Sequence, residues 1–309
     1  MMEIVLNQPY SFCQLGRRSN QEDARFPDTE APQDFRPAFI VCDGVGGCDK
    51  GEMASRIVAE TIGESIQSYD LSKHFDSIDF GDIMKIVLRN VETASRKSHS
   101  DMATTMTFLC FHAGGAFAAH IGDSRIYQVR PNVGIIYRSE DHSLVNALVH
   151  SGNITPEEAL THPQKNVITR CISASRINNV SVTTCQIDDI EPGDYFFLCT
   201  DGVLHNISDA KLVEILSSNT DDKEKIDKIA LLSELSSDNN TAYLIGISEV
   251  SDKALNGDNE DIVLPLSSET KLIDNAATYQ TSDIRIPIEN SRSKFSGFLK
   301  KLFLGKSFK

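Results

Sequence analysis

Two apolar runs of this sequence end in the same way, with an aspartate followed by a glycine. Residues 38–42 (AFIVC) lead into Asp43, and residues 194–200 (DYFFLCT) lead into Asp201. Short runs that are rich in aromatic and branched residues and bounded by turn residues predict buried strands. The glycine lets the backbone turn sharply after each strand and exposes a carbonyl oxygen. Two strands of this kind can place their terminal carboxylates together.

Further strand-like runs alternate with helical segments between residues 10 and 248. The other runs that predict strands are residues 104–111, 115–122, 125–129 and 241–247. Apolar residues recur at helical spacing from Met53 to Ile66 and again from Ile83 to Val91. Because strands come from the start, middle and end of the region while the two helices are grouped, the pattern favours an α+β layered domain over a doubly wound one.

The bulk composition is that of a globular protein with an acidic surface. Apolar residues make up 40% of the 309, and the net charge is −14, which opposes binding to nucleic acid or to an anionic membrane. The seven cysteines are scattered and predict neither a disulfide framework nor a zinc site. No apolar run approaches the roughly 20 residues that span a bilayer. We therefore expect a cytoplasmic protein.

Composition changes twice along the chain. Residues 1–250 carry the patterns above and are expected to form one domain. Residues 251–290 hold eight acids against three bases without sustained periodicity, which predicts an acidic, disordered linker. Residues 291–309 hold six bases and no acid among apolar residues, as in amphipathic helices that dock on the inner face of a membrane or in a partner's groove. A frayed tail is the alternative for this last segment.

A polar, turn-rich stretch covers residues 139–178 and interrupts the strands. Within it, Thr155-Pro156-Glu157-Glu158 reads as a helix start, with proline at the first helical position and acids in the first turn. An insertion of this length is often a flap over a site. A solvated helical excursion is the alternative.

Two further acidic motifs accompany the two strand ends. Arg18-Ser-Asn-Gln-Glu22-Asp23 lies near the start of the chain, and Asp238-Asn-Asn-Thr lies near residue 240. Clustered carboxylates repel one another unless a cation neutralises them, and an all-oxygen set without His or Cys favours Mg²⁺ or Mn²⁺. Two such ions about 3.5–4 Å apart activate a water for attack on a phosphorus atom, and the planar guanidinium of Arg18 suits phosphate oxygens.

Each motif alone is a common turn, but their joint order resembles the 2C-type metal-dependent protein phosphatases, and among these the compact bacterial members. The matching pieces are RSNQED (18–23), VCDGVGG (41–47), ATT (103–105), HIGDSRIY (120–127), residues 151–170, LCTDGV (198–203) and DNNT (238–241). The resemblance implies a four-layer α-β-β-α sandwich. In it, helix pairs flank two antiparallel sheets, and a dinuclear metal site lies at one end.

The resemblance also implies a role for each acidic position. Asp43 would bridge both metal ions while the Gly44 carbonyl contacts one of them, and Asp201 and Asp238 would complete the shell of the other. The supporting and substrate-binding roles fall to Glu22 and Asp23 through metal-bound waters, to Asp123 at a weaker third ion, and to Arg18 at the substrate phosphate. The position of a histidine in animal members is Val45 here, which cannot donate a proton.

The implied activity is hydrolysis of phosphoserine and phosphothreonine on proteins by a metal-activated water, with two Mn²⁺ or Mg²⁺ ions and a weaker third. The implied partners are phosphorylated proteins and a bacterial Ser/Thr kinase, and we expect a monomer. Two alternatives stay open. One is a non-catalytic module that binds phosphoproteins, and the other is a scaffold that acts through residues 291–309.

Overall fold

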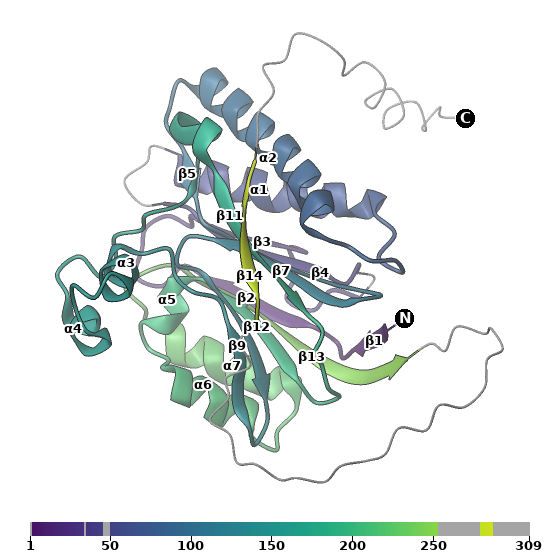
Figure 1. Cartoon of the computed structure of the whole chain (residues 1–309). Coiled ribbons are helices and arrows are strands. Elements are labelled where there is room, and N and C mark those ends of the chain that lie inside the picture. The colour runs from purple at the N-terminus through teal and green to yellow at the C-terminus, as the bar shows by residue number, and fades with distance from the viewer. Residues whose placement is uncertain (1, 34, 46–49, 253–278, 287–309) are drawn as a thin grey trace, which may run out of the picture.

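Two large antiparallel sheets stack face to face, and helices cover their outer surfaces (Figure 1). The structure is a computed structural model, and it describes residues 2–33, 35–45, 50–252 and 279–286. Helices α1 (Gly51–Ser65) and α2 (Ser77–Ser98) lie on one outer face. The other outer face carries α5 (Asp201–Leu204), α6 (Asp209–Leu216) and α7 (Asp222–Ser233).

The first sheet has the order β1-β13-β12-β8-β9, and β2 also pairs with β13. Its strands are β1 (Met2–Leu6), β2 (Tyr10–Gln14), β8 (Arg125–Arg130), β9 (Gly134–Arg138), β12 (Tyr195–Cys199) and β13 (Asn240–Asp252). Strand β12 is buried at every position, and β13 is buried from Asn240 to Ile247, because both strands lie inside the sheet and are covered on both faces.

The second sheet has the order β14-β11-β7-β6-β4-β3. Its strands are β3 (Asp23–Phe26), β4 (Ala38–Asp43), β6 (Met106–His112), β7 (Gly115–Ile121), β11 (Ser181–Ile187) and β14 (Thr281–Arg285). A short ladder joins β5 (Ala103–Thr104) to β10 (Ile172–Ser173). The six runs that the sequence predicts as strands all lie in these two sheets or the short ladder.

Three separate apolar clusters hold the layers together. One lies between the second sheet and α1 and α2, and it contains Phe80, Phe108 and Phe117. The second, with Phe39 and Phe196, lies between the two sheets, and the third packs the first sheet against α6 and α7. Three interfaces require four layers, so the predicted α+β sandwich of two antiparallel sheets is confirmed.

In the polar stretch at residues 139–178, two short helices project from one side of the sandwich (Figure 1), whereas Ile172 and Ile177 near its end are buried in the core. The stretch contains the helices α3 (Leu144–His150) and α4 (Pro156–Thr161) and the 3-10 turn η2 (Ala174–Asn179). The predicted helix start is confirmed: the Thr155 hydroxyl accepts from the amide of Glu158, whose carboxylate accepts from the amide of Thr155. We call residues 139–178 the flap.

The C-terminal part of the chain departs from expectation. The sequence predicts a disordered linker over residues 251–290, and this is wrong for residues 281–285, which form β14 at the edge of the second sheet. The sequence of this strand is polar and gives no strand signal. The strand forms because its main chain pairs with β11 and because the adjacent Ile286 is buried, and both contacts involve residues far away in the chain. The predicted amphipathic tail, residues 291–309, lies outside the described residues.

Helices α6 and α7 are absent from the sequence-based prediction. They are only 8 and 12 residues long, and only a few positions of α7, such as Ile226 and Ile229, are buried. Short helices depend on such tertiary packing more than on local preference. Within the described residues, no helix combines the length and apolarity required to cross a bilayer.

Candidate metal centre and active site

Strand pairing brings the first two aspartates together. Asp23 begins β3 and Asp43 ends β4, and the two residues are directly opposed in the antiparallel ladder. Asp23 is buried, and its Oδ2 accepts a hydrogen bond of 3.0 Å from the hydroxyl of Thr200, just before Asp201. The ends of β4 and β12 therefore meet at the same end of the sandwich.

Close backbone contacts explain the glycines that follow Asp43 and Asp201. A Cβ atom on Gly202 would lie 1.9 Å from the carbonyl oxygen of Asn239, so only glycine lets this turn pack against the neighbouring one. A Cβ atom on Gly44 would lie 2.7 Å from the carbonyl oxygen of Glu22. The glycines thus allow the four acidic motifs to pack against one another.

Five aspartates interact electrostatically in this region. Burial raises the pKa of Asp43 well above its usual value, and repulsion from the other four raises it further, in decreasing order Asp23, Asp201, Asp123 and Asp238. The carboxyl of Asp201 also lies within hydrogen-bonding reach of Asp43. The structure therefore gathers the predicted site aspartates, which come from five separate parts of the chain.

Raised pKa values are shared by the buried members of the cluster. The pKa of Asp23 is raised to about 8 by burial and by repulsion from Asp201 and Asp238, against the hydrogen bond from the Thr200 hydroxyl. Burial and then Asp201 and Asp141 raise the pKa of Asp123, which lies between β7 and β8. These carboxyls resist ionisation as long as no cation compensates their charge.

Unsatisfied oxygens show that the cluster suits a cation. Asp23 Oδ1 and Asp201 Oδ1 are buried and have no hydrogen-bond partner, although buried carboxylate oxygens are normally paired. An oxygen-only donor set of this kind fits Mg²⁺ or Mn²⁺. Within the described residues no three His, Cys, Asp or Glu side chains converge into a ready-made cage, so the carboxylates would have to draw closer around an ion.

Two threonines and a serine fix the backbone of the central residue, Asp43, and sequence reasoning assigned them no role. The carbonyl oxygen of Asp43 accepts from the amide of Thr105 and the hydroxyl of Thr104, each at 2.8 Å. The amide of Asp43 donates to the Thr105 hydroxyl, which also bonds Ser124 at 2.7 Å beside Asp123. Thr105 therefore couples the Asp43 turn to the Asp123 turn. The signal in the sequence is the ATT piece that follows α2.

A second missed residue, Asn239, ties the N-terminal motif to the Asp238 turn. Its Oδ1 accepts from the amide of Glu22 at 2.9 Å, and its Nδ2 donates to the carbonyl oxygens of Leu15 and Asn20. The buried amide thereby holds the loop that carries Arg18. The backbone of Glu22 is fixed by Asn239, but its side chain has no hydrogen bond or ion pair within the described part of the chain.

The one basic residue predicted for the site lies at its rim. Arg18 is exposed, and its Nη2 atom is 2.6 Å from Asp238 Oδ2. The guanidinium also interacts with the charges of Glu22 and Asp43. An ion that binds Asp238 would weaken this pair, which would leave the guanidinium free for an anionic substrate at the same rim.

The raised pKa values predict how pH changes the stability of the metal-free protein. In the unfolded chain these carboxyls titrate near pH 3.9, whereas in the folded protein the same carboxyls stay protonated to higher pH. The folded state then binds more protons than the unfolded state, so stability is present at low pH and is lost as pH rises through the folded values. We expect the chelator-treated protein to melt at a higher temperature at about pH 5 than at about pH 8.

Two variants separate this effect from general charge repulsion. Asp23→Asn should narrow the difference between the two melting temperatures because it removes a buried carboxyl. Asp82→Asn should not, because this carboxylate is exposed on α2 and is paired with Lys85. A chelated wild type whose melting temperature is equal at both pH values, or higher at the upper one, would contradict the assignment.

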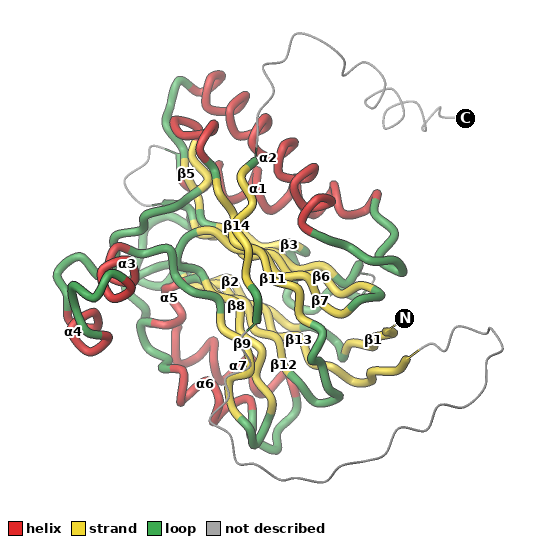
Figure 2. Tube along the Cα trace, in the orientation of Figure 1, coloured by secondary structure: helices red, strands yellow, loops and turns green. Residues whose placement is uncertain are grey.

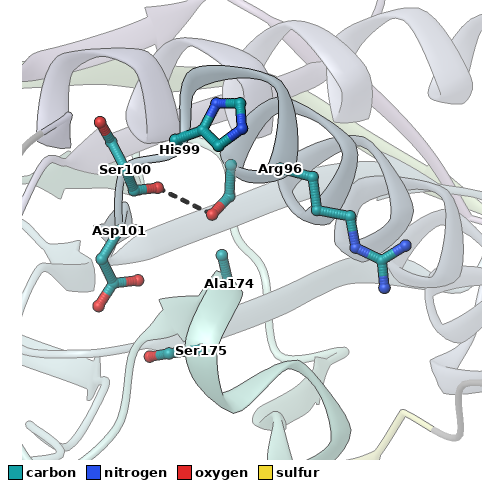
Figure 3. A pocket seen from close by; sticks show the side chains of 7 residues that line it. Arg96, His99, Ser100, Asp101, Ala174 and Ser175 are labelled. Carbon is teal, nitrogen blue, oxygen red and sulfur yellow. Dashed lines mark hydrogen bonds between the residues drawn. The ribbon is translucent and has the colours of Figure 1, made fainter.

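A shallow groove away from these carboxylates lies at the C-terminal end of α2 (Figure 3). It is lined by Ser95, Arg96, His99, Ser100, Asp101, Ala174 and Ser175. None of the predicted site residues lines it, and the hydroxyl of Ser95 already bonds the carbonyl oxygen of Ser100 at 2.8 Å. The chemistry therefore lies with the carboxylates at the end of the sandwich.

Known proteins resemble this chain over most of its length. Residues 16–231 match the family model described as protein phosphatase 2C. A putative protein phosphatase 2C-type of Streptococcus pyogenes is 35% identical over 189 residues, which cover 60% of this chain and 75% of that protein. Protein phosphatase PhpP of Streptococcus pneumoniae is 29% identical over 252 residues, which cover 75% of this chain and 94% of PhpP.

A solved structure shows the same architecture. The serine/threonine phosphatase Stp1 from Staphylococcus aureus superposes with a TM-score of 0.68 at 26% identity, covering 81% of this chain and 98% of Stp1. The family match over residues 16–231 includes Asp23, Asp43, Asp123 and Asp201, whereas Asp238 lies beyond it.

Proposed function

The chain belongs to the protein phosphatase 2C family, and on this premise we propose that it hydrolyses phosphoserine and phosphothreonine on proteins. The observation that carries the proposal is the cluster of buried carboxylates around Asp43, with unsatisfied oxygens on Asp23 and Asp201. Such a cluster is costly without cations. An enzyme that uses divalent ions would explain why these carboxylates lie together.

The proposed ion-binding residues follow from the family resemblance, and their burial and oxygen donors support the proposal. Asp43 at the centre would contact two Mn²⁺ or Mg²⁺ ions, with the carbonyl of Gly44 on one of them and with Asp201 and Asp238 on the other. Asp23 and Glu22 would support the site from behind, and Asp123 would hold a weaker third ion. Bound ions supply the Lewis acidity that activates water for attack on phosphorus.

The protein's own side chains bind and orient the substrate. The Arg18 guanidinium offers two parallel donors to the phosphate oxygens, which orients the phosphorus atom toward the carboxylate cluster. Thr105 and Asn239 keep the Asp43 and Glu22 backbones in place through the hydrogen bonds described above. Val45, two residues after Asp43, has no proton to donate, so the proton for the leaving oxygen would have to come from a water held at the site.

The proposed cellular setting follows from the same chemistry. We expect the substrates to be proteins phosphorylated by a Ser/Thr kinase of the same cell, and we expect the enzyme to act in the cytoplasm as a monomer. Contact of residues 291–309 with a membrane or partner stays a prediction, because that segment lies outside the described residues.

A peptide panel tests the substrate class. With Mn²⁺ present, the protein should release phosphate from phosphoserine and phosphothreonine peptides at least about tenfold faster than from phosphotyrosine peptides of the same sequence. Phosphate release is measured with a dye, and the same peptides are tested for binding. If the protein bound phosphopeptides but released no phosphate with any divalent metal ion, the result would support the non-catalytic alternative and contradict the proposed activity.

A further inference from the structure

The C-terminal strand β14 packs beside the flap (Figure 2). It pairs with β11 along its whole length, from Thr281 opposite Cys185 to Arg285 opposite Ser181. The preceding Tyr279 bonds Gln128 and stacks edge-on against Tyr137. The family match ends at residue 231, so β14 lies outside the matched region and adds an outer strand to the second sheet.

One side chain of β14 makes two charged contacts. The Asp283 Oδ2 atom is 2.8 Å from Nη1 of Arg170 at the C-terminal side of the flap. Its Oδ1 atom accepts a hydrogen bond of 2.5 Å from the Thr183 hydroxyl on β11. Both carboxylate oxygens of Asp283 are therefore engaged, and each bond is charge-assisted.

A hydrogen-bond relay continues from Thr183 to the backbone beside Asp123. His142 Nδ1 accepts from the amide of Gly122 at 3.1 Å, so this nitrogen carries no proton. Its Nε2 must then donate to the Thr183 hydroxyl, 2.9 Å away, whose own proton goes to Asp283. The direction of every bond is thus set, from the turn that precedes Asp123 to β14.

The backbone of His142 joins the two ends of the flap. Its amide donates to the carbonyl oxygen of Gly122 at 2.8 Å, and its carbonyl oxygen accepts from the amide of Thr169 at 2.7 Å. Arg170 follows Thr169 directly. The contacts of Asp283 therefore reach both flap ends, one through Arg170 and one through His142.

The N-terminal end of the flap has a further anchor within the matched region. Asp141 receives two parallel bonds from Arg125, at 2.6 and 2.7 Å. At the C-terminal end, the charged partner of Arg170 within the described residues is Asp283. This end of the flap is also held by the matched region, through the pairing of β10 with β5 and the burial of Ile172 and Ile177. The charged contact of Arg170 comes instead from a strand beyond that region.

We propose that β14 is a working part of the flap, with Asp283 as a positioning residue that fixes Arg170 and His142 and thereby the flap over the phosphatase site. The importance for turnover rests on the proposed function, but the structural claim does not. Docking of the C-terminal strand on β11 then adds to the order of the flap between His142 and Arg170. Substrate binding through the flap depends on a segment outside the matched family region.

Asp283→Ala tests this, with Arg285→Ala as the matched control. Arg285 lies two residues along the same strand, on the same side, and its side chain makes no hydrogen bond or ion pair within the described ranges. Hydrogen exchange of the amides of residues 144–169 is measured in metal-free protein, where no turnover is involved. We expect about fivefold faster exchange in Asp283→Ala and unchanged exchange in Arg285→Ala.

Kinetics give a second readout on the Mn²⁺-loaded enzyme. Because a loosened flap weakens substrate binding more than chemistry, Asp283→Ala should raise KM for a phosphopeptide about threefold with little change in kcat. A small substrate such as p-nitrophenyl phosphate, which does not need the flap, should be turned over normally. If the wild type were inactive while the exchange result held, the proposed function would fail and the positioning role would stand.

Arg170→Gln covers the case in which Asp283→Ala releases the whole strand. This variant leaves β14 unchanged, and exchange of the β14 amides reports whether the strand stays docked. Faster flap exchange in Arg170→Gln with β14 protected supports the proposal. Wild-type flap exchange in both Asp283→Ala and Arg170→Gln, or an equal increase in Arg285→Ala, would overturn it.

Discussion

Replacing Asp43 by Asn should reduce the rate of phosphate release by about three orders of magnitude at saturating Mn²⁺. Asp43 is the residue with which all the other site aspartates interact, and an amide in its place removes the charge that two cations would share. The measurement is steady-state release of phosphate from a phosphothreonine peptide. Asp82→Asn on α2, which removes an exposed charge, should keep wild-type activity.

The same variant should be folded, and this separates loss of chemistry from loss of structure. Because the Asp43 carboxyl is buried among like charges, its removal relieves repulsion in the metal-free protein. We expect Asp43→Asn to melt at an equal or higher temperature than wild type in chelator. An inactive variant that melts well below wild type would mean that Asp43 serves the fold, and the assignment to catalysis would lose its support.

Replacing Arg18 by Ala should lower kcat/KM for phosphopeptides about 100-fold, because charge-assisted bonds to phosphate strengthen as charge develops on the transferred group. The control is Arg17→Ala. Arg17 is also exposed, and its hydrogen bond within the described residues runs from its backbone amide to the carbonyl oxygen of Ser236, so its side chain should matter little. The measurement is the full dependence of rate on substrate concentration.

The pair of arginines also tests where the anion binds. A loss confined to Arg18→Ala supports phosphate binding at the rim beside Asp238. Similar losses in both variants would point to a general electrostatic attraction of the substrate, since neighbouring exposed charges act alike at long range. That result would remove Arg18 from the specific role given to it.

The sequence was most informative where burial and turn chemistry act locally. Strand β4 is apolar throughout and ends in Asp-Gly, and this pattern alone predicts both a central strand and a carboxylate at its end. The same holds for β12 and Asp201. The start of α4 followed from its capping residues. These features depend on neighbours in the chain.

Features that depend on distant partners escaped prediction. The strand β14 is polar and mostly exposed, and its position depends on its pairing with β11 and on the contacts of Asp283. The role of Thr105 arises because β6 begins beside the end of β4. The direction of the His142 relay requires knowing that Gly122 faces its Nδ1 atom. None of these juxtapositions is encoded by spacing.

The functional roles of the aspartates also had to come from the family resemblance. Composition and turn patterns indicated clustered carboxylates and an oxygen-only metal site, but they did not rank Asp43 above Asp201. The structure gives a physical reason to place Asp43 above Asp201. Asp43 interacts electrostatically with the other four site aspartates, and its backbone amide donates a hydrogen bond to the Thr105 hydroxyl. The coordination itself stays a prediction.

A metal titration of wild type and Asp43→Asn tests the central claim most directly. Mn²⁺ is added to chelator-treated protein, and calorimetric binding and phosphate release from one phosphothreonine peptide are followed on the same samples. We predict that wild-type activity rises from near zero as about two ions bind per chain, and that Asp43→Asn binds fewer ions and stays inactive. Full activity in the metal-free wild type, or wild-type activity in Asp43→Asn at the same Mn²⁺ concentrations, would contradict it.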